Sequence, residues 1–242
     1  MEMNSRNTIA LISIYNDGNW TKTYEDLSHH NWYERDLTKG KAMLNYDFIT
    51  ILDNEYPERL KQGNRPPFVL FYKGNINLLN NNDIISLGAD QLWDYSWDLL
   101  DNLIFKFKYH YMVGCNSVSL GIAKSTKGLI VVANKGIDCL DQQLVNKVLE
   151  NGGLIISEIP YGVDNEGTND SSRIISALEN RLVVIHCNQE NSFVVRQVVN
   201  SINLGHDVYI MPTPLDSVEK SRNNELIAQG GILFYTPEQL TE

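Results

Sequence analysis

Short apolar runs alternate with longer amphipathic stretches from residue 83 to the end of the chain. The runs are rich in β-branched residues and lack the alternation of strands that expose one face, so they indicate strands buried on both faces. They predict strands at 84–87, 111–113, 129–132, 154–156, 182–186, 208–211 and 232–235. Helices are predicted between them at 140–151, before Gly152-Gly153, and at 191–204, before Gly205, because glycine commonly follows the last helical turn.

The pattern is different before residue 83. Strands are predicted at 48–52 and 68–72, separated by a short helix that begins near Pro57 and by the breaker Pro66-Pro67. Residues 1–45 are polar and aromatic, with one apolar stretch at 9–14 and room for one or two helices over 23–36. We therefore divide the chain into an N-terminal extension of unclear fold, residues 1–45, and one domain, residues 46–242.

Buried strands separated by helices are typical of a parallel sheet covered on both sides. We predict an α/β fold, an extended Rossmann-like, doubly wound and mostly parallel sheet with helices on both faces and right-handed crossovers. Ligands of such sheets bind beyond the carboxyl ends of the strands. The loops of interest then begin near Gly88, Gly114, Ala133, Ser157, Cys187 and Pro212.

Charge and composition narrow the possible partners. Thirty acidic and 20 basic residues give a formal net charge of −10, which disfavours a protein that coats nucleic acid regardless of sequence. A local basic pocket is compatible with this total, because salt screens fields beyond about 8–10 Å. The three scattered cysteines indicate reduced thiols. Without a long apolar run or a secretory signal, a cytoplasmic protein with no membrane partner is expected.

The predicted strand ends carry few catalytic residue types, and no dinucleotide, Walker or nucleophile-elbow motif is present. Ser157-Glu158 could pair a nucleophile with a base, but a turn-capping serine beside a hydrogen-bonded glutamate is favoured. His186-Cys187 stands at a strand end, where consecutive side chains point to opposite faces, so a buried histidine and a core thiol are favoured over a dyad. His29-His30 is interpreted as solvated surface rather than a metal site.

Cations beside helix starts and glycines are better candidates for binding. Arg173 opens an apolar helix after Asp170-Ser171-Ser172, where a guanidinium and free N–H groups could hold a phosphate or carboxylate, or where it could be a plain exposed residue. Lys135-Gly136 follows a predicted strand, and its glycine allows either close backbone approach to a ligand or an ordinary turn. Arg222 begins another polar helix start.

Several segments, in this order, resemble the DprA/Smf family of DNA-processing proteins. They span 48–60, 66–75, 135–138, 154–162, 172–178, 205–212 and 224–231, and together they cover about residues 46–236. The most specific of them reads Pro66-Pro67-Phe68-Val69-Leu70-Phe71-Tyr72-Lys73-Gly74-Asn75. The resemblance implies an extended Rossmann-like domain that binds single-stranded DNA, protects strands taken up in natural transformation and helps to load the RecA-type recombinase. It also implies a homodimer that is not an enzyme and has no cofactor or metal.

The departures from the family pattern fall in its binding pocket. The first parallel strand usually ends Gly-Ser-Arg in the family and ends Gly88-Ala89-Asp90 here, which exchanges a cation for an anion. The next loop, 113–120, keeps one glycine, Gly114. The family's Arg-Asn-Arg is Ser171-Ser172-Arg173 in this chain, and its Ser-Gly-Ser loop corresponds approximately to residues 191–194. Where the family has a glycine two residues before Gly136, this chain has Asn134. A lost arginine removes a charge-assisted contact, so these changes weaken phosphate binding.

The leading hypothesis is a divergent, non-catalytic DprA-like protein that binds single-stranded DNA. Its candidate contacts are Arg173, Lys135, Gly136, Gly88, Gly114 and Ser192. Two alternatives use the same scaffold. One is a paralog that binds a small phosphorylated ligand or nucleotide, and the other is an interaction protein that has lost the pocket.

Overall fold

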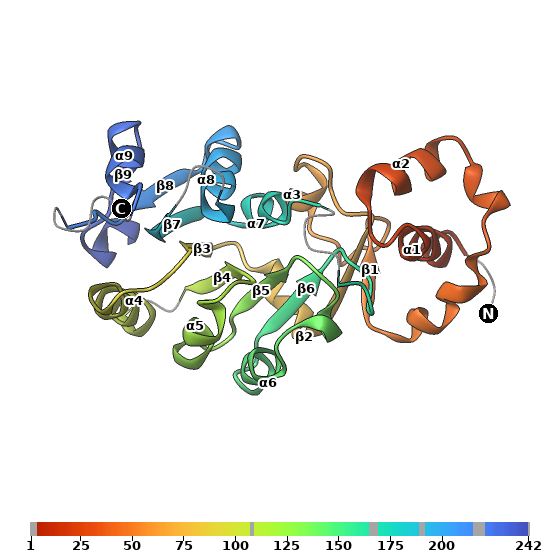
Figure 1. The fold of residues 1–242 in the computed structure, drawn as a ribbon, viewed down its shortest axis with the longest axis horizontal. Helices are drawn as coiled ribbons and strands as arrows, with labels where there is room; N and C mark the ends of the chain where they lie inside the picture. The colour runs from red at the N-terminus through yellow and green to blue at the C-terminus, as the bar shows by residue number, and fades with distance from the viewer. Residues whose placement is uncertain (1–3, 107–108, 165–168, 189–191, 215–220, 242) are drawn as a thin grey trace.

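The computed structural model describes residues 4–106, 109–164, 169–188, 192–214 and 221–241. Within these residues one sheet of nine strands runs through the molecule in the order β1-β2-β6-β5-β4-β3-β7-β8-β9 (Figure 1). The strands are β1 (Phe48–Thr50), β2 (Val69–Gly74), β3 (Ile84–Ala89), β4 (His110–Gly114), β5 (Ile130–Ala133), β6 (Leu154–Ser157), β7 (Arg181–His186), β8 (Asp207–Ile210) and β9 (Ile232–Leu233).

The seven strands from β6 to β9 in this order are parallel, and β1 and β2 add an antiparallel pair beside β6. The chain first builds outward from β3 through β4 and β5 to β6, and then returns to the other side of β3 with β7. The order therefore reverses between β3 and β7, and the crevice at that reversal is where doubly wound sheets bind ligands.

Helices cover both faces of the sheet. Figure 1 shows α4 (Asp94–Lys106), α5 (Ser119–Ser125) and α6 (Gln142–Glu150) on one side, and α7 (Ser172–Leu178) and α8 (Phe193–Asn203) on the other. Neighbouring strand residues alternate between the two cores: Ile85 and Val131 face the first, and Ile84 and Val132 the second. The doubly wound fold predicted from the sequence is confirmed.

The short helices and 3₁₀ segments complete the description. They are α3 (Glu58–Lys61), α9 (Asn223–Ala228), η3 (Ile76–Asn80), η4 (Ile137–Cys139) and η6 (Pro237–Thr241). Each predicted strand exists, although the last is shortened from 232–235 to two residues. No helix in the described part of the chain has the length and apolar character needed to cross a bilayer.

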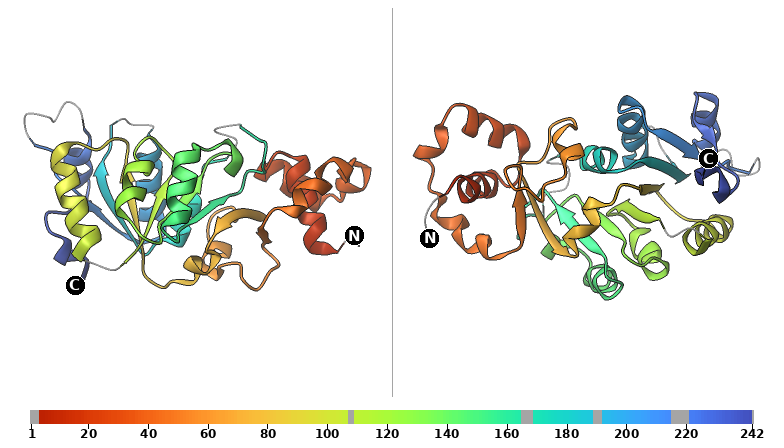
Figure 2. Two further views of the ribbon diagram at one scale, coloured as in Figure 1. Left: turned by 90° about the horizontal axis from the view of Figure 1, so that it is seen from below. Right: turned by 180° about the vertical axis from the view of Figure 1, so that it is seen from behind.

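The N-terminal segment is helical and lies at one end of the molecule, beyond β1 (Figure 2). It contains α1 (Ser5–Tyr15), α2 (Trp20–Ser28), η1 (Asn31–Glu34) and η2 (Leu37–Asn45) around a small core of Leu11, Ile12 and Leu37. Arg6 joins α1 to the sheet, because its guanidinium lies 4.1 Å from the Phe48 ring centroid and donates to Asp53 at 2.9 Å.

Candidate functional site

The crevice between β3 and β7 is closed by the chain's own groups. Asp90 follows β3, and its backbone N–H donates to the His186 carbonyl at 3.0 Å. Its carboxylate Oδ2 accepts the backbone N–H of Asn188 at 2.8 Å. Asp90 thus takes up an N–H at the end of β7 that an anionic ligand would need, in addition to repelling that ligand.

The predicted ligand-binding glycines are packed against protein. A Cβ on Gly114 would lie 2.4 Å from Cε1 of Phe193, and one on Gly88 would lie 3.1 Å from Cγ1 of Val194. The absence of these two side chains allows the start of α8 to approach the ends of β4 and β3. Gly136 donates its N–H to Val163 at 2.8 Å, and a Cβ there would lie 2.5 Å from the Pro160 carbonyl oxygen. Ligand contact by these glycines stays a prediction.

Four cations lie in the loops and helix starts at the edge of the sheet formed by the carboxyl ends of the parallel strands. Each has a carboxylate partner. Lys135 lies 3.1 Å from Asp164, Arg196 lies 3.4 Å from Asp170, and Arg222 lies 2.6 Å from Glu225. Those three carboxylates have exposed fractions of 64%, 37% and 58%. The fourth cation, Arg173, pairs with Glu158 at 8% and 4% exposure. The first three cations are themselves 21%, 47% and 23% exposed, so solvent reaches them, whereas Arg173 is buried.

The buried pair of Arg173 and Glu158 lacks some of the hydrogen bonds that its polar atoms could form. Arg173 Nη2 donates to Glu158 Oε2, while Arg173 Nη1 and Glu158 Oε1 have no hydrogen-bond partner among the described residues. Burial raises the pKa of Glu158, and attraction to Arg173 opposes that shift in part. Because burial of a lone charge is so unfavourable, each member of this pair requires the other.

Ser192 caps α8. Its Oγ accepts the backbone N–H of Val195 at 3.2 Å and lies 3.5 Å from Sγ of Cys187. The predicted ligand contact at Ser192 is therefore already bonded within the chain, as N-cap serines commonly are.

The residue pairs with possible chemistry take structural positions. Ser157 Oγ donates to the Lys135 carbonyl at 2.8 Å and accepts the Ile159 N–H at 3.0 Å, as a turn-capping serine does. His186 and Cys187 are 1% and 0% exposed, and the His186 ring meets Trp93 edge-on at 4.4 Å between centroids. The predicted buried histidine and core thiol are confirmed. No group of three metal-binding side chains gathers in the part of the chain that the structure describes.

Two asparagines that the sequence did not single out tie the strand ends together. Asn116 Nδ2 donates to the Ala89 carbonyl at 2.7 Å and so joins the loop after β4 to β3. Asn223 donates to the carbonyls of Ile185 and Met211 and accepts the N–H of Cys187. The only sequence signal for Asn223 was the polar helix start after Arg222.

Comparisons with known proteins agree with this architecture. The family model described as DNA recombination-mediator protein A matches residues 47–242. Protein Smf of Escherichia coli K12 is 23% identical over 218 residues, and Protein Smf of Borreliella burgdorferi is 24% identical over 178 residues. These alignments cover 82% and 67% of the chain, which spans only 56% of each relative's length.

Two solved structures share the fold. DNA processing protein A from Streptococcus pneumoniae matches with a TM-score of 0.77 and 17% identity, over 100% of this chain and 98% of that one. DNA processing protein A from Helicobacter pylori, studied for its single-stranded DNA binding mode, matches with a TM-score of 0.66 and 16% identity, over 81% and 94%. With the family model matching most of its length, the chain belongs to the family of DNA recombination-mediator protein A.

Proposed function

We propose that the chain binds single-stranded DNA along the carboxyl edge of its sheet and acts in DNA processing. One observation carries the proposal: Lys135, Arg196 and Arg222 all lie at this edge with side chains that are 21%, 47% and 23% exposed, each paired with an exposed carboxylate. The family membership and the DNA binding of the Helicobacter pylori protein support it. Arg173 is left out of the proposed contacts, because its ion pair with Glu158 is buried.

The exposed carboxylates can give way to phosphates. An exposed ion pair stabilises a protein by only about 0–1 kcal/mol, so the exchange of such a carboxylate for a phosphate costs little free energy. Binding is then weak and strongly salt-dependent. With three phosphate contacts, the slope of log K against log salt is expected to be about −2 for a single strand.

Fluorescence anisotropy with a labelled oligonucleotide at several salt concentrations tests the proposal. Replacing Lys135, Arg196 or Arg222 by glutamine should reduce the steepness of the salt slope by about 0.7 per residue. Arg181→Gln is the matched control, since Arg181 pairs with Asp83 in the same way at the opposite edge of the sheet. Asp170→Asn should strengthen binding. Absence of binding by the wild type at low salt would overturn the proposal.

The family also suggests how the protein acts. We infer that it works by binding rather than by catalysis, in the cytoplasm, as a homodimer and beside a RecA-type recombinase. The name of the matching family, a recombination mediator, supports a role beside a recombinase. We also propose that residues 1–45 are a separate helical unit. Light scattering and pull-down of a purified recombinase are the direct tests.

A second candidate is an interaction protein that no longer uses the crevice. The contacts of Phe193 with Gly114 and of Asp90 with Asn188 favour it, since in both cases the chain's own side chains occupy the crevice where the strand order reverses. They also count against a small phosphorylated ligand in the same crevice. The double variant Phe193→Ala with Asp90→Asn separates the two functions. If it binds DNA more tightly than the wild type, DNA binding is supported. If neither the wild type nor this variant binds DNA, the interaction protein is supported.

A further inference from the structure

An aromatic platform lies where α2 meets the segment that leads into β2. We define it by the rings of Trp20, Tyr24 and Phe68 and by the side chain of Arg65. Trp20 stacks with Tyr24 at 5.2 Å between centroids and 7° between planes, and with Phe68 at 5.4 Å and 23°. Trp20 Nε1 donates to the Pro66 carbonyl at 2.9 Å, which fixes the indole. Half of the Tyr24 side chain, 50%, is exposed.

Arg65 differs from every other arginine in the chain. Six of the others donate to a carboxylate or a backbone carbonyl, and Arg196 forms an ion pair with Asp170. Arg65 is exposed, and no hydrogen-bond or ion-pair partner of it occurs among the described residues. Its guanidinium carbon lies 5.5 Å from the Trp20 ring centroid, and its φ of 50° is a conformation that non-glycine residues rarely adopt. Such strain is common at functional sites.

The platform shares an edge with the surface cations. β2 pairs antiparallel with β6 and places Phe71 opposite Ser157, so Phe68 lies beyond the carboxyl end of β6. The backbone N–H of Trp20 donates to the side-chain Oδ1 of Asn169 at 3.2 Å. The next residue, Asp170, is the partner of Arg196. A short run of contacts therefore connects the platform with the cationic part of the edge.

We propose that the platform stacks a base of single-stranded DNA on Tyr24, while Arg65 contacts the adjoining phosphate. The inference rests on the proposed function and adds a second kind of contact to it. Aromatic rings beside a cationic track are the usual combination for binding single strands without sequence preference, because every base has a π-face. Among the described residues Arg65 has no carboxylate partner, so it can accept a phosphate without releasing one of them.

Two oligonucleotides of equal length test the proposal, one with bases and one abasic. Tyr24→Leu should weaken binding of the first about tenfold and leave binding of the abasic strand unchanged. Tyr24→Phe should bind like the wild type, and Arg65→Gln should weaken binding of both strands. Tyr33→Leu is the matched control, because Tyr33 is also exposed, at 71%, and stacks on Trp32 at 3.8 Å but has no contact with Phe68 among the described residues.

The outcomes separate this inference from the proposed function. If the wild type binds the strand with bases and Tyr24→Leu binds it equally well, the platform has another occupant, such as a protein, and the proposed function stands. If the wild type binds neither strand at low salt, both fall. Photocrosslinking of an oligonucleotide that carries halogenated bases should label the peptide containing Tyr24, and labelling confined to other peptides would also overturn the inference.

Discussion

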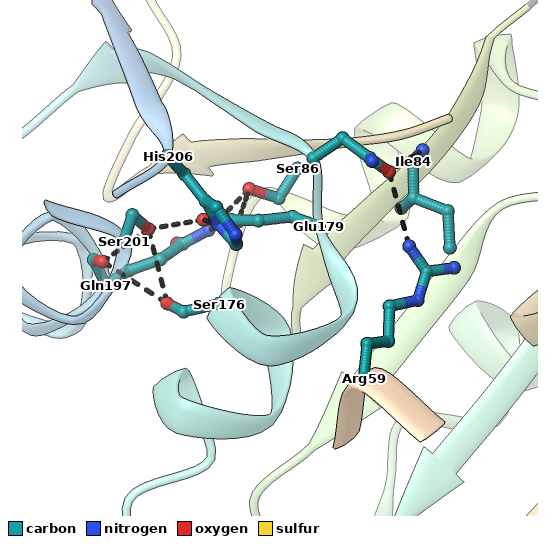
Figure 3. Close-up of polar contacts among 9 residues, drawn as sticks. Arg59, Ile84, Ser86, Ser176, Glu179, Gln197, Ser201 and His206 are labelled. Carbon is teal, nitrogen blue, oxygen red and sulfur yellow. Dashed lines mark hydrogen bonds and ion pairs between the residues drawn. The ribbon is translucent and has the colours of Figure 1, made fainter. Parts of the chain in front are cut away.

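The two ends of α7 each hold a buried glutamate, and they stabilise it in opposite ways. At the N-terminal end, Glu158 is 4% exposed and faces one cation, Arg173. At the C-terminal end, Glu179 is 2% exposed and faces mainly neutral donors (Figure 3). Ser86 donates to its Oε2 and Ser201 to its Oε1, while Gln197 lies 3.4 Å from Oε2. His206 Nδ1 lies 3.8 Å from Oε1 at the outer side.

The difference shows what Arg173 does. A buried carboxylate can be held mainly by hydroxyl and amide donors, as at Glu179, when several elements supply them. At Glu158 the side chain of Asn169 is the neutral donor, and the charge is balanced by the guanidinium of Arg173. Arg173 therefore compensates an internal charge in this structure, and its contact with a phosphate stays a prediction. The predictions below test whether the two ends differ in this way.

Arg173→Ala is expected to have the largest effect. It leaves Glu158 buried without a counter-charge, which costs about 3–5 kcal/mol of unfolding free energy. Urea denaturation measures the change. The double variant Glu158→Leu with Arg173→Met should recover most of the loss, because an apolar pair of similar volume needs no compensation. A loss below about 1 kcal/mol in the single variant would show that the pair is not coupled as described.

Glu179→Ala should destabilise the protein less, by about 2–3 kcal/mol. It removes the acceptor of Ser86 and Ser201 but leaves only neutral groups without a partner. Glu179→Gln keeps one acceptor oxygen, so its unfolding free energy should lie between those of the wild type and the alanine variant. If Glu179→Ala equals or exceeds Arg173→Ala in the same denaturation experiment, the contrast between charged and neutral compensation fails.

Ser201→Ala isolates one donor of the neutral network. Ser201 Oγ donates to Glu179, and it also lies 2.7 Å from the Gln197 carbonyl. Since other donors remain at Glu179, we expect a loss of about 1 kcal/mol in unfolding free energy. A loss as large as that of Glu179→Ala would mean that this single hydroxyl, and not the set of donors, holds the carboxylate.

The smallest expected effect is a pH dependence of the unfolding free energy that comes from Glu158, at the N-terminal end of α7. Burial raises the pKa of Glu158 above its ordinary value of 4.5. A carboxyl with a raised pKa binds protons more readily in the folded protein, so its contribution to stability grows as the pH falls from that raised pKa toward 4.5. Wild type should therefore gain stability relative to Glu158→Gln over this window. Denaturation from about pH 8 to 5 measures it, and a constant difference would contradict the shift.

Much of the fold was predictable because buried strands have a recognisable composition. The motif of residues 66–75 was informative for a physical reason: Gly74 has a φ of 105°, and a Cβ there would lie 2.3 Å from the Gly153 carbonyl oxygen. Helix α4 was missed although Trp97, Leu100 and Ile104 repeat at helical spacing, and α5 has only seven residues. Helix α1 was missed because its apolar stretch, 9–14, is continuous and could equally be a strand.

The site was less predictable, because ion pairs are decided in three dimensions. Lys135 and Asp164, or Arg196 and Asp170, are far apart in the sequence and carry no local signal of pairing. Asp90 was correctly identified as an anion in the crevice, but its bond to the Asn188 N–H depends on the two strand ends meeting. The glycines were predicted to allow close approach of a ligand, which stays a prediction. Nothing in their pattern indicated that side chains of α8 pack on Gly88 and Gly114, or that the Pro160 carbonyl lies against Gly136.

The contact between Phe193 and Gly114 has a kinetic consequence. The ring occupies the space beside the Cα of Gly114, so a phosphate that approached this side of the glycine would have to displace it, which is a first-order step within the protein. Association with the crevice would then approach a limiting rate at high ligand concentration instead of rising in proportion to it. One side chain would then set the rate of any such binding.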